Sequence, residues 1–123
     1  APLFEITNIG EGDRSTRVGH LVDSRLNLYV AIHPIAQIVR QRAAEAPRLA
    51  EALAGVRARS VDQLRAHFAP ELAQHTKAGA DDLVALIDAL TSFESWELMA
   101  TTHGRSRPQI RRAWIDGLAA LLA

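Results

Sequence analysis

Residues 82–90, DLVALIDAL, and residues 110–122, IRRAWIDGLAALL, decide how this chain folds. In the first stretch only Asp82 and Asp88 are polar, and at ~100° per residue its apolar side chains cover a broad arc of a helix. A helix that is apolar on nearly all sides is buried on nearly all sides. Together the two segments carry more apolar surface than a chain of 123 residues can cover by itself. We therefore predict that they pack against the same segments of a second copy and form a homodimer.

The predicted dimer interface lies on these two segments. In the second, Ala113 and Gly117 stand four residues apart and leave a shallow groove that another helix can approach closely. The interface residues that we predict are Leu83, Leu86, Leu90, Ile110, Ala113, Trp114, Gly117, Leu118 and Leu121.

The rest of the sequence also predicts helices. Alanine is abundant, aromatic residues make up only 5% of the chain, and the alternation typical of strands is nearly absent. We expect an all-α fold of about five helices, in which the last two form a four-helix bundle with those of the second subunit. Pro34 removes a donor from the helix ladder, so the first helix should kink or restart there. The expected helices cover residues 13–32, 35–44, 48–69, 81–103 and 106–122.

Several short motifs mark where these helices begin. Asp13 is placed to cap the first helix. Residues 91–94, TSFE, and residues 106–109, SRPQ, both match the capping box, so the fourth helix should kink or restart at the first motif and the last helix should begin at the second. Residues 76–79, TKAG, are expected to separate the third helix from the fourth.

The chain is long enough for one domain, which we assign to residues 13–123. Residues 1–12, APLFEITNIGEG, form a linker or N-terminal arm. Their apolar side chains followed by a Gly-Glu-Gly break fit either the tail of a preceding helix or an ordered arm.

Composition limits the classes of partner. Lys plus Arg and Asp plus Glu number 14 each, so no excess charge indicates nucleic acid or anionic lipid as a partner. No cysteine is present, which excludes disulfides and thiolate metal sites. The apolar runs are far shorter than the ~18 residues of a membrane span, and no signal peptide opens the chain. We expect a cytoplasmic protein without a membrane partner.

Arg25 is the polar residue that fits its surroundings least well. It falls at the centre of the apolar stripe of the first helix, and a buried charge without a partner is strongly unfavourable. One interpretation is an internal salt bridge to Asp62, Asp88 or Glu94, or a side chain that reaches solvent. The other is a ligand pocket with apolar walls and a few convergent polar groups.

The pocket interpretation also draws on the third helix, where Ser60 and His67 interrupt an apolar stripe. Since Arg25 only donates hydrogen bonds, the ligand would be a small amphipathic molecule with an acceptor or a negative charge. Each aromatic candidate for the walls also fits plain core packing. The predicted ligand-binding residues are Arg25, Tyr29, Ser60, Leu64, His67, Phe68, Phe93 and Trp96.

Nothing in the sequence predicts an enzyme. It contains no HExxH motif, no nucleophile beside a histidine and no Gly-rich phosphate loop. We therefore predict no catalytic residue, no metal site and no cofactor.

Two motifs in the C-terminal third carry a resemblance to a known family. Residues 92–97, SFESWE, and residues 103–106, HGRS, lie between an aliphatic helix and an apolar last helix. The whole run from Leu83 to Leu122 resembles the C-terminal half of TetR-family transcriptional regulators, and residues 25–53 are similar to the ligand-domain helices of that family. The resemblance covers roughly residues 13–123.

The resemblance implies an all-helical regulatory domain that binds a small effector and dimerises through its last two helices. The helix-turn-helix of the family is absent from these 123 residues, so contact with DNA would need a region outside this chain. Either this is a fragment or the DNA-reading part has been lost. The alternative is a structural dimeric helical bundle that acts as a protein interaction module without a small-molecule ligand. A cavity beside Arg25 would favour the first interpretation and a solid core the second.

Overall fold

Helices make up nearly all of residues 5–123, the part of the chain that the computed structural model describes. No strand occurs in this part, which confirms the predicted all-α class. Five α-helices in this part have five or more residues, in agreement with the expected number. In chain order the elements are α1 (Arg14–Glu45), α2 (Pro47–His67), the one-turn α3 (Ala69–Leu72), α4 (Lys77–Leu90), α5 (Phe93–Glu97), the π-helical turn η2 (Leu98–Thr102) and α6 (Arg107–Leu122).

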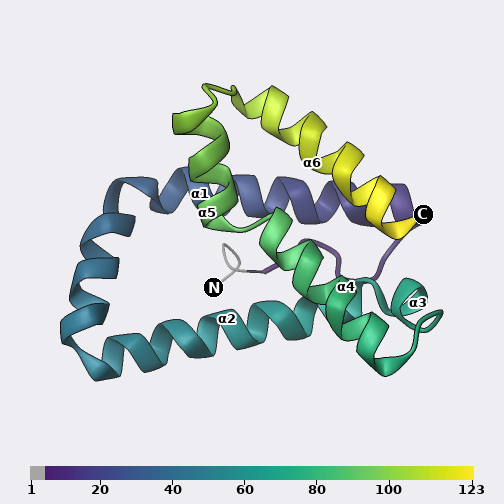
Figure 1. Cartoon of the computed structure of the whole chain (residues 1–123), viewed down its shortest axis with the longest axis horizontal. Coiled ribbons are helices and arrows are strands. Elements are labelled where there is room, and N and C mark those ends of the chain that lie inside the picture. The colour runs from purple at the N-terminus through teal and green to yellow at the C-terminus, as the bar shows by residue number, and fades with distance from the viewer. Residues whose placement is uncertain (1–4) are drawn as a thin grey trace.

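The helices form an open frame around the middle of the molecule. Figure 1 shows α1 crossing the molecule and then turning sharply, so that its last turns connect it to α2, which runs back below it. The two views together show α4 and α5 closing the other side of this frame. Helix α6 packs against both α1 and α4.

The corner of the frame lies within α1. The helix continues through Pro34 to Glu45, so residues 35–44 are not a separate helix as we expected. Pro34 still lacks the N–H that the ladder needs, and Figure 1 shows the helix bending in this part of its length. The expected kink is therefore present, without a break.

The core occupies only one side of the molecule, where the first half of α1 meets α4, α6 and the end of α2. Between Tyr29 and Leu64 no residue is buried. The second half of α1 and most of α2 are thus held away from the core. The buried apolar residues are Ile6, Val18, Leu21, Val22, Leu26, Tyr29, Leu64, Phe68, Leu83, Val84, Ile87, Ile110, Trp114, Leu118 and Leu122.

Capping side chains set the helix starts, mostly as predicted. The Asp13 carboxylate accepts a hydrogen bond from Thr16 N at 2.8 Å. Ser106 and Gln109 form the predicted capping box at the start of α6.

Two predicted starts were wrong in position. Ser92 caps α5 instead of Thr91, because the Thr91 hydroxyl already donates to Ile87 O at 2.8 Å. Thr76 does not lie in a break: its side chain accepts from Gly79 N and starts α4 at Lys77, four residues before the expected start.

Residues 5–12 form an ordered arm against α1 and α2. Ile6 is buried, and its N–H donates to Gln63 Oε1 at 2.9 Å. Gly12 takes a φ of +88°, which allows the chain to turn into α1; a Cβ there would lie 2.8 Å from the Thr16 side chain. Of the two interpretations of this segment, the structure shows the ordered arm for residues 5–12, while residues 1–4 lie outside the described part.

One copy of the chain covers much of the surface that we assigned to a dimer interface. Leu83, Ile110, Trp114 and Leu118 are all at most 7% exposed, since α6 packs on α1 and α4 of the same chain. Leu90 fills the space above Gly117, where an added Cβ would lie 3.1 Å from Leu90 Cδ2. The sequence therefore overestimated the apolar surface left for a second copy. The helical patterns of the last two helices do not show how much of that surface α1 covers.

Candidate functional site

Arg25 lies at a junction of three helices and forms an internal ion pair. Its Nη1 atom donates to Asp88 Oδ1 of α4 at 2.9 Å, and its Nη2 atom donates to Ser60 Oγ of α2 at 2.9 Å. Tyr29 OH, one turn along α1, is 3.4 Å from Nη1. This is the salt bridge to Asp88 that one interpretation of the sequence predicted. The guanidinium is buried, and its charge is balanced by a carboxylate that is 41% exposed at the edge of the junction.

Tyr29 extends this junction into the core. Its hydroxyl donates to Thr91 O at 2.5 Å, which ties α1 to the end of α4. Burial raises the pKa of Tyr29, and the positive charge of Arg25 opposes that shift only in part. The phenol therefore stays protonated and acts as a hydrogen-bond donor. The structure thus brings together Arg25, Tyr29 and Ser60 from the predicted ligand-binding set, but as a junction whose hydrogen bonds are made within the chain.

The other predicted ligand residues of α2 lie elsewhere. Leu64 and Phe68 have no exposed surface and belong to the core. His67 contacts the N-terminal arm: its Nδ1 accepts from Gly10 N at 2.9 Å, and its Nε2 donates to Arg17 O at 2.7 Å. Both ring nitrogens are used, so His67 fastens the arm to α1 and does not line a pocket with Ser60, as the shared helix face suggested.

This geometry predicts that stability depends on the charge of His67. Burial lowers the pKa of the imidazole below its usual 6.5, and the nearby Arg17 charge acts in the same direction, outweighing the bond to the Arg17 carbonyl. The unfolded chain therefore takes up this proton at a higher pH than the folded chain does. Stability is expected to fall as pH drops below 6.5 and to stop falling below the pKa of the folded state. Urea unfolding at a series of pH values measures this slope.

The matched variants are His67→Gln and His103→Gln, the second at an exposed histidine. His67→Gln should remove most of the slope between pH 6.5 and pH 4.5, above the range in which Glu71 is protonated, whereas His103→Gln should keep it. Equal slopes in the wild type and His67→Gln would show that another group is responsible.

Phe93 and Trp96 form an aromatic cluster with Tyr29 on the inner side of the frame. The Tyr29 and Phe93 rings meet edge to face, with centroids 5.5 Å apart, and His33 approaches Trp96 with centroids 5.2 Å apart. Phe93 and Trp96 are half-buried and pack against the core. The Arg40 guanidinium lies over the Phe93 ring, 4.8 Å from its centroid.

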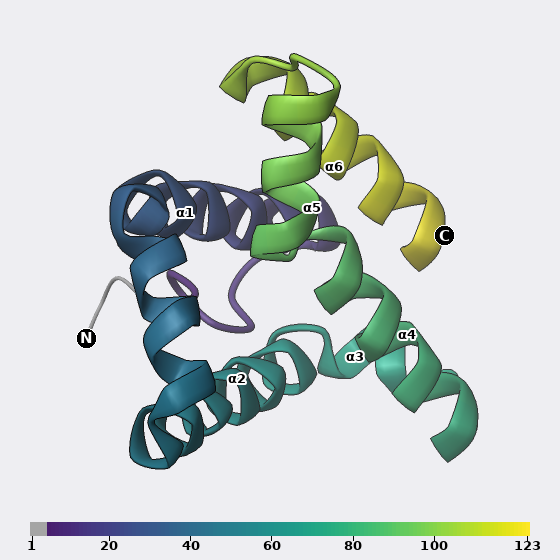
Figure 2. The same ribbon diagram turned by 60° about the vertical axis from the view of Figure 1, so that its left-hand side comes forward.

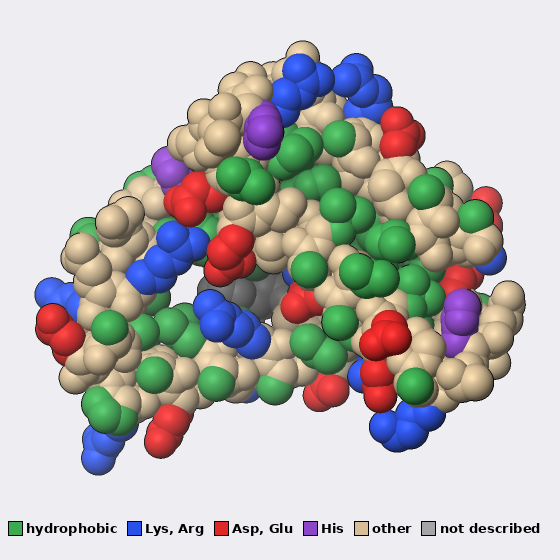
Figure 3. Space-filling view, viewed as in Figure 1, with side chains coloured by type: hydrophobic (Ala, Val, Ile, Leu, Met, Phe, Trp, Pro, Cys, Tyr) green, Lys and Arg blue, Asp and Glu red, His purple; other side chains and the backbone are tan. Residues whose placement is uncertain are grey.

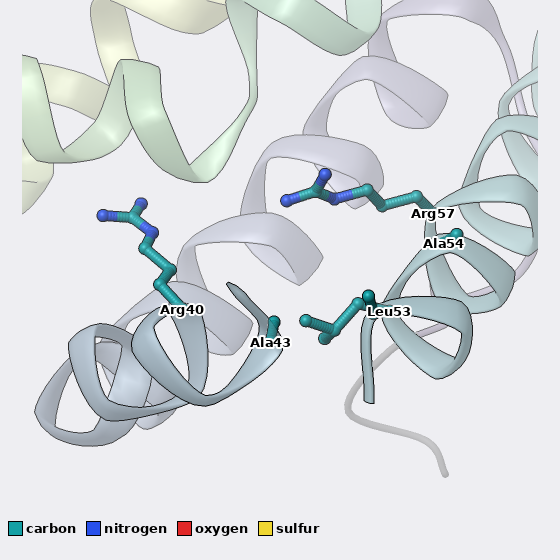
Figure 4. Close-up of a pocket in the computed structure, with 6 residues that line it drawn as sticks. Arg40, Ala43, Leu53, Ala54 and Arg57 are labelled. Atoms are coloured by element: carbon teal, nitrogen blue, oxygen red, sulfur yellow. The ribbon is translucent and has the colours of Figure 1, made fainter. Parts of the chain in front are cut away.

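A groove of about 430 Å³ lies between the second half of α1 and the first half of α2. Figure 3 shows the molecule hollowed on this side, with both basic and acidic side chains at the edge of the hollow. In Figure 4, Arg57 and Leu53 extend from α2, while Arg40 rises from the α1 wall. None of the predicted ligand-binding residues lines this groove, and neither does Asp88. The lining residues are Arg40, Ala43, Ala50, Leu53, Ala54 and Arg57.

Two arginines line the groove, and acidic neighbours balance the charge of only one of them. Arg40 shares its charge with Glu97 at 3.3 Å and with Glu94 at 3.9 Å, both on or beside α5. Arg57 has no acidic side chain within 4.0 Å among residues 5–123, and no acidic residue lines the groove. Sequence reasoning missed this site because alanines and arginines on a helix indicate a solvated face. The sequence did contain one indication of the groove. Alanines occur on both segments that flank Ala46-Pro47, and such small side chains leave space between two helices.

Within residues 5–123, no helix combines the length and the apolar character needed to cross a membrane. The same part of the chain contains no group of three or more His, Asp or Glu side chains arranged to hold a metal ion. We compared the sequence and the structure with known proteins. No family model, no curated protein and no solved structure matches the chain.

Proposed function

We propose that the chain is a TetR-like regulatory domain that binds a small amphipathic effector in the groove between α1 and α2 and dimerises through α4 and α6. The observation that carries this proposal is the stretch from residue 30 to residue 63, which contains no buried residue yet is folded as two long helices around a groove. Helices that leave the core give up the burial that stabilises most helices. A groove of about 430 Å³ is in the size range of small-molecule sites.

A panel of amphipathic compounds with the same chain length tests this proposal by thermal shift: decanoate, decanol and decyltrimethylammonium. At about 100 times its Kd a ligand adds about 2.7 kcal/mol to stability. For a domain of this size that corresponds to a rise in Tm of roughly 10 °C. We expect at least one compound to give such a rise.

The matched variants are Ala54→Trp, which fills the groove, and Ala52→Trp, which adds the same ring at an exposed position outside it. Ala54→Trp should abolish the rise in Tm and Ala52→Trp should preserve it. If no compound shifts the Tm of the wild type, or if Ala54→Trp responds as fully as Ala52→Trp, the groove is not the binding site.

The proposed dimer uses the apolar surface that one copy leaves uncovered. Figure 3 shows hydrophobic side chains spread over the face formed by α4, α5 and α6. Leu86 is 53% exposed and Leu98 is 52% exposed, while Leu90, Ile115 and Leu121 are half-buried. Exposed Ala113 lies on α6 as well. Contiguous apolar surface of this kind is typical of interaction sites.

Leu86→Glu is expected to convert the dimer to a monomer, because it places a charge in the proposed interface without disturbing the core. Ile38→Glu is the matched control, since Ile38 on α1 is also 53% exposed and lies outside α4 and α6. Sedimentation velocity measures both variants beside the wild type. A wild type that sediments as a monomer, or a dimer that persists in Leu86→Glu, would contradict the proposed interface.

The alternative function is that of a structural dimeric bundle without a small-molecule ligand. The observation in its favour is that Arg25 finds Asp88, Ser60 and Tyr29 within its own chain, so this arginine needs no ligand to balance its charge. A dimer in sedimentation together with a silent compound panel would establish the alternative.

A further inference from the structure

We propose that the α1–α2 groove selects amphipathic molecules with an anionic head group, which Arg57 binds and Arg40 helps to hold. This inference rests on the proposed ligand-binding function of the groove and names the class of its ligand. It also predicts which contact within the chain the ligand replaces.

The charged residues that line the groove favour an anionic head group. Among residues 5–123, Arg40 and Arg57 are its only charged lining residues, and both are positive. Arg57 has no acidic partner within 4.0 Å in the described part of the chain, so its guanidinium is free to bind an anion. Arginine only donates hydrogen bonds, and its planar group binds a carboxylate or phosphate with two parallel bonds. A cationic head group would instead be repelled by Arg57, because no acidic side chain within 4.0 Å balances that charge in the described part of the chain.

The lining between the two arginines is apolar and favours a ligand with an apolar tail. Leu53 and the three alanines present only methyl groups and one isobutyl group to the groove. Arg57 and Leu53 both belong to the first half of α2 and line the same groove, which therefore offers a charged group as well as apolar surface (Figure 4). A ligand that fits both needs a charged head and an apolar tail. A small polar anion would bind Arg57 but would leave the apolar lining exposed to water.

Arg40 already has partners within the chain, and an anionic ligand would compete with them. Arg40 lies over the Phe93 ring and contacts Glu97 at 3.3 Å, and thereby connects the α1 wall of the groove to α5. The two side chains are 42% and 36% exposed, so the ion pair is weak and an anion in the groove can compete for the guanidinium. Occupation of the groove would loosen α5 and η2, where exposed Leu98 belongs to the proposed dimer face. The ligand and the dimer are thus coupled through Arg40.

Isothermal titration calorimetry with the compounds named above tests the head group, with decyl phosphate added as a second anion. All share one tail, so differences in affinity report on the head. We expect decanoate or decyl phosphate to bind at least roughly tenfold more tightly than decanol, as charge-assisted bonds do. The tighter of the two anions identifies the head group. Decyltrimethylammonium should bind more weakly than decanol.

Two variants on α2 locate the effect. Arg57→Gln should weaken binding of the anion about tenfold and leave decanol unchanged, because only the ionic contact is lost. Arg59→Gln removes an exposed charge two residues away that does not line the groove, and should bind as the wild type does. This control separates a specific contact from the general effect of one positive charge.

The outcomes distinguish an error in the inferred head group from a failure of the proposed ligand-binding function. If decanol and the anions bind equally well, or if Arg57→Gln and Arg59→Gln weaken the anion equally, the inferred head group is wrong while the groove remains a binding site. If none of the compounds binds, the proposed function fails as well.

Discussion

Glu71→Gln is expected to lower the free energy of unfolding by about 3 kcal/mol or more, because it leaves a buried arginine without its counter-charge. Arg17 Nη1 and Nη2 donate to the two carboxylate oxygens of Glu71 at 2.5 and 3.0 Å, and both side chains are only 7% exposed. The hydrogen bond from Arg17 also holds the pKa of Glu71 below its usual 4.5. The pair therefore stabilises the fold above pH 4.5 and loses that effect as pH falls through the lowered pKa. Chemical denaturation followed by circular dichroism gives the free energy.

An exposed pair of the same type provides the control. Arg111 Nε donates to Asp23 at 2.7 Å, but these side chains are 46% and 48% exposed. Asp23→Asn should therefore cost about 1 kcal/mol or less. The double variant Arg17→Met with Glu71→Leu should recover much of the loss, since it removes both charges. If Glu71→Gln costs no more than Asp23→Asn, a buried ion pair does not hold α3 to α1.

Trp114→Ala is expected to cost about 3–5 kcal/mol of stability, because it leaves a large cavity in the core. The indole is 1% exposed and meets the Tyr29 ring edge to face, with centroids 6.2 Å apart. The loss should appear as a lower denaturation midpoint with an unchanged slope.

Two further variants show whether the loss of stability comes from the missing aromatic ring at position 114. Trp114→Phe keeps an aromatic ring against Tyr29 and should cost far less than Trp114→Ala. Ala113→Gly, at the exposed neighbouring position, should cost only about 1 kcal/mol, through helix propensity. A wild-type midpoint for Trp114→Ala would place the indole outside the core. Because Trp114 is buried within one copy, a charge placed there would unfold the chain, and only exposed positions such as Leu86 test the dimer.

The sequence predicted what depends on local geometry. The all-α class follows from helical periodicity, and the caps at Asp13 and Ser106 follow from side chains that reach the nearest free N–H groups. Its errors at Thr76 and Thr91 have one cause. In each case a threonine hydroxyl forms a local hydrogen bond that the motif did not reveal: Thr76 accepts from Gly79 N, and Thr91 donates to Ile87 O.

The sequence did not predict what depends on neighbours far along the chain. It identified Arg25 as a residue that needs a partner, but it offered three carboxylates, and only the packing of α1 against α4 selected Asp88. His67 shares a helical face with Ser60, yet Gly10 of the arm and Arg17 of α1 take up its two ring nitrogens. The groove escaped prediction altogether, since its walls come from two helices that face each other across the turn at Ala46-Pro47.

The most direct test of the ligand-binding groove is a map of amide chemical shifts in ¹⁵N-labelled protein titrated with decanoate. We expect the changes to cluster in residues 40–43 and 50–57, on the two walls of the groove, with smaller changes in α5 around Glu97. Changes centred instead on Arg25, Ser60 and Asp88, or no saturable change at all, would contradict the account of this groove as the effector site.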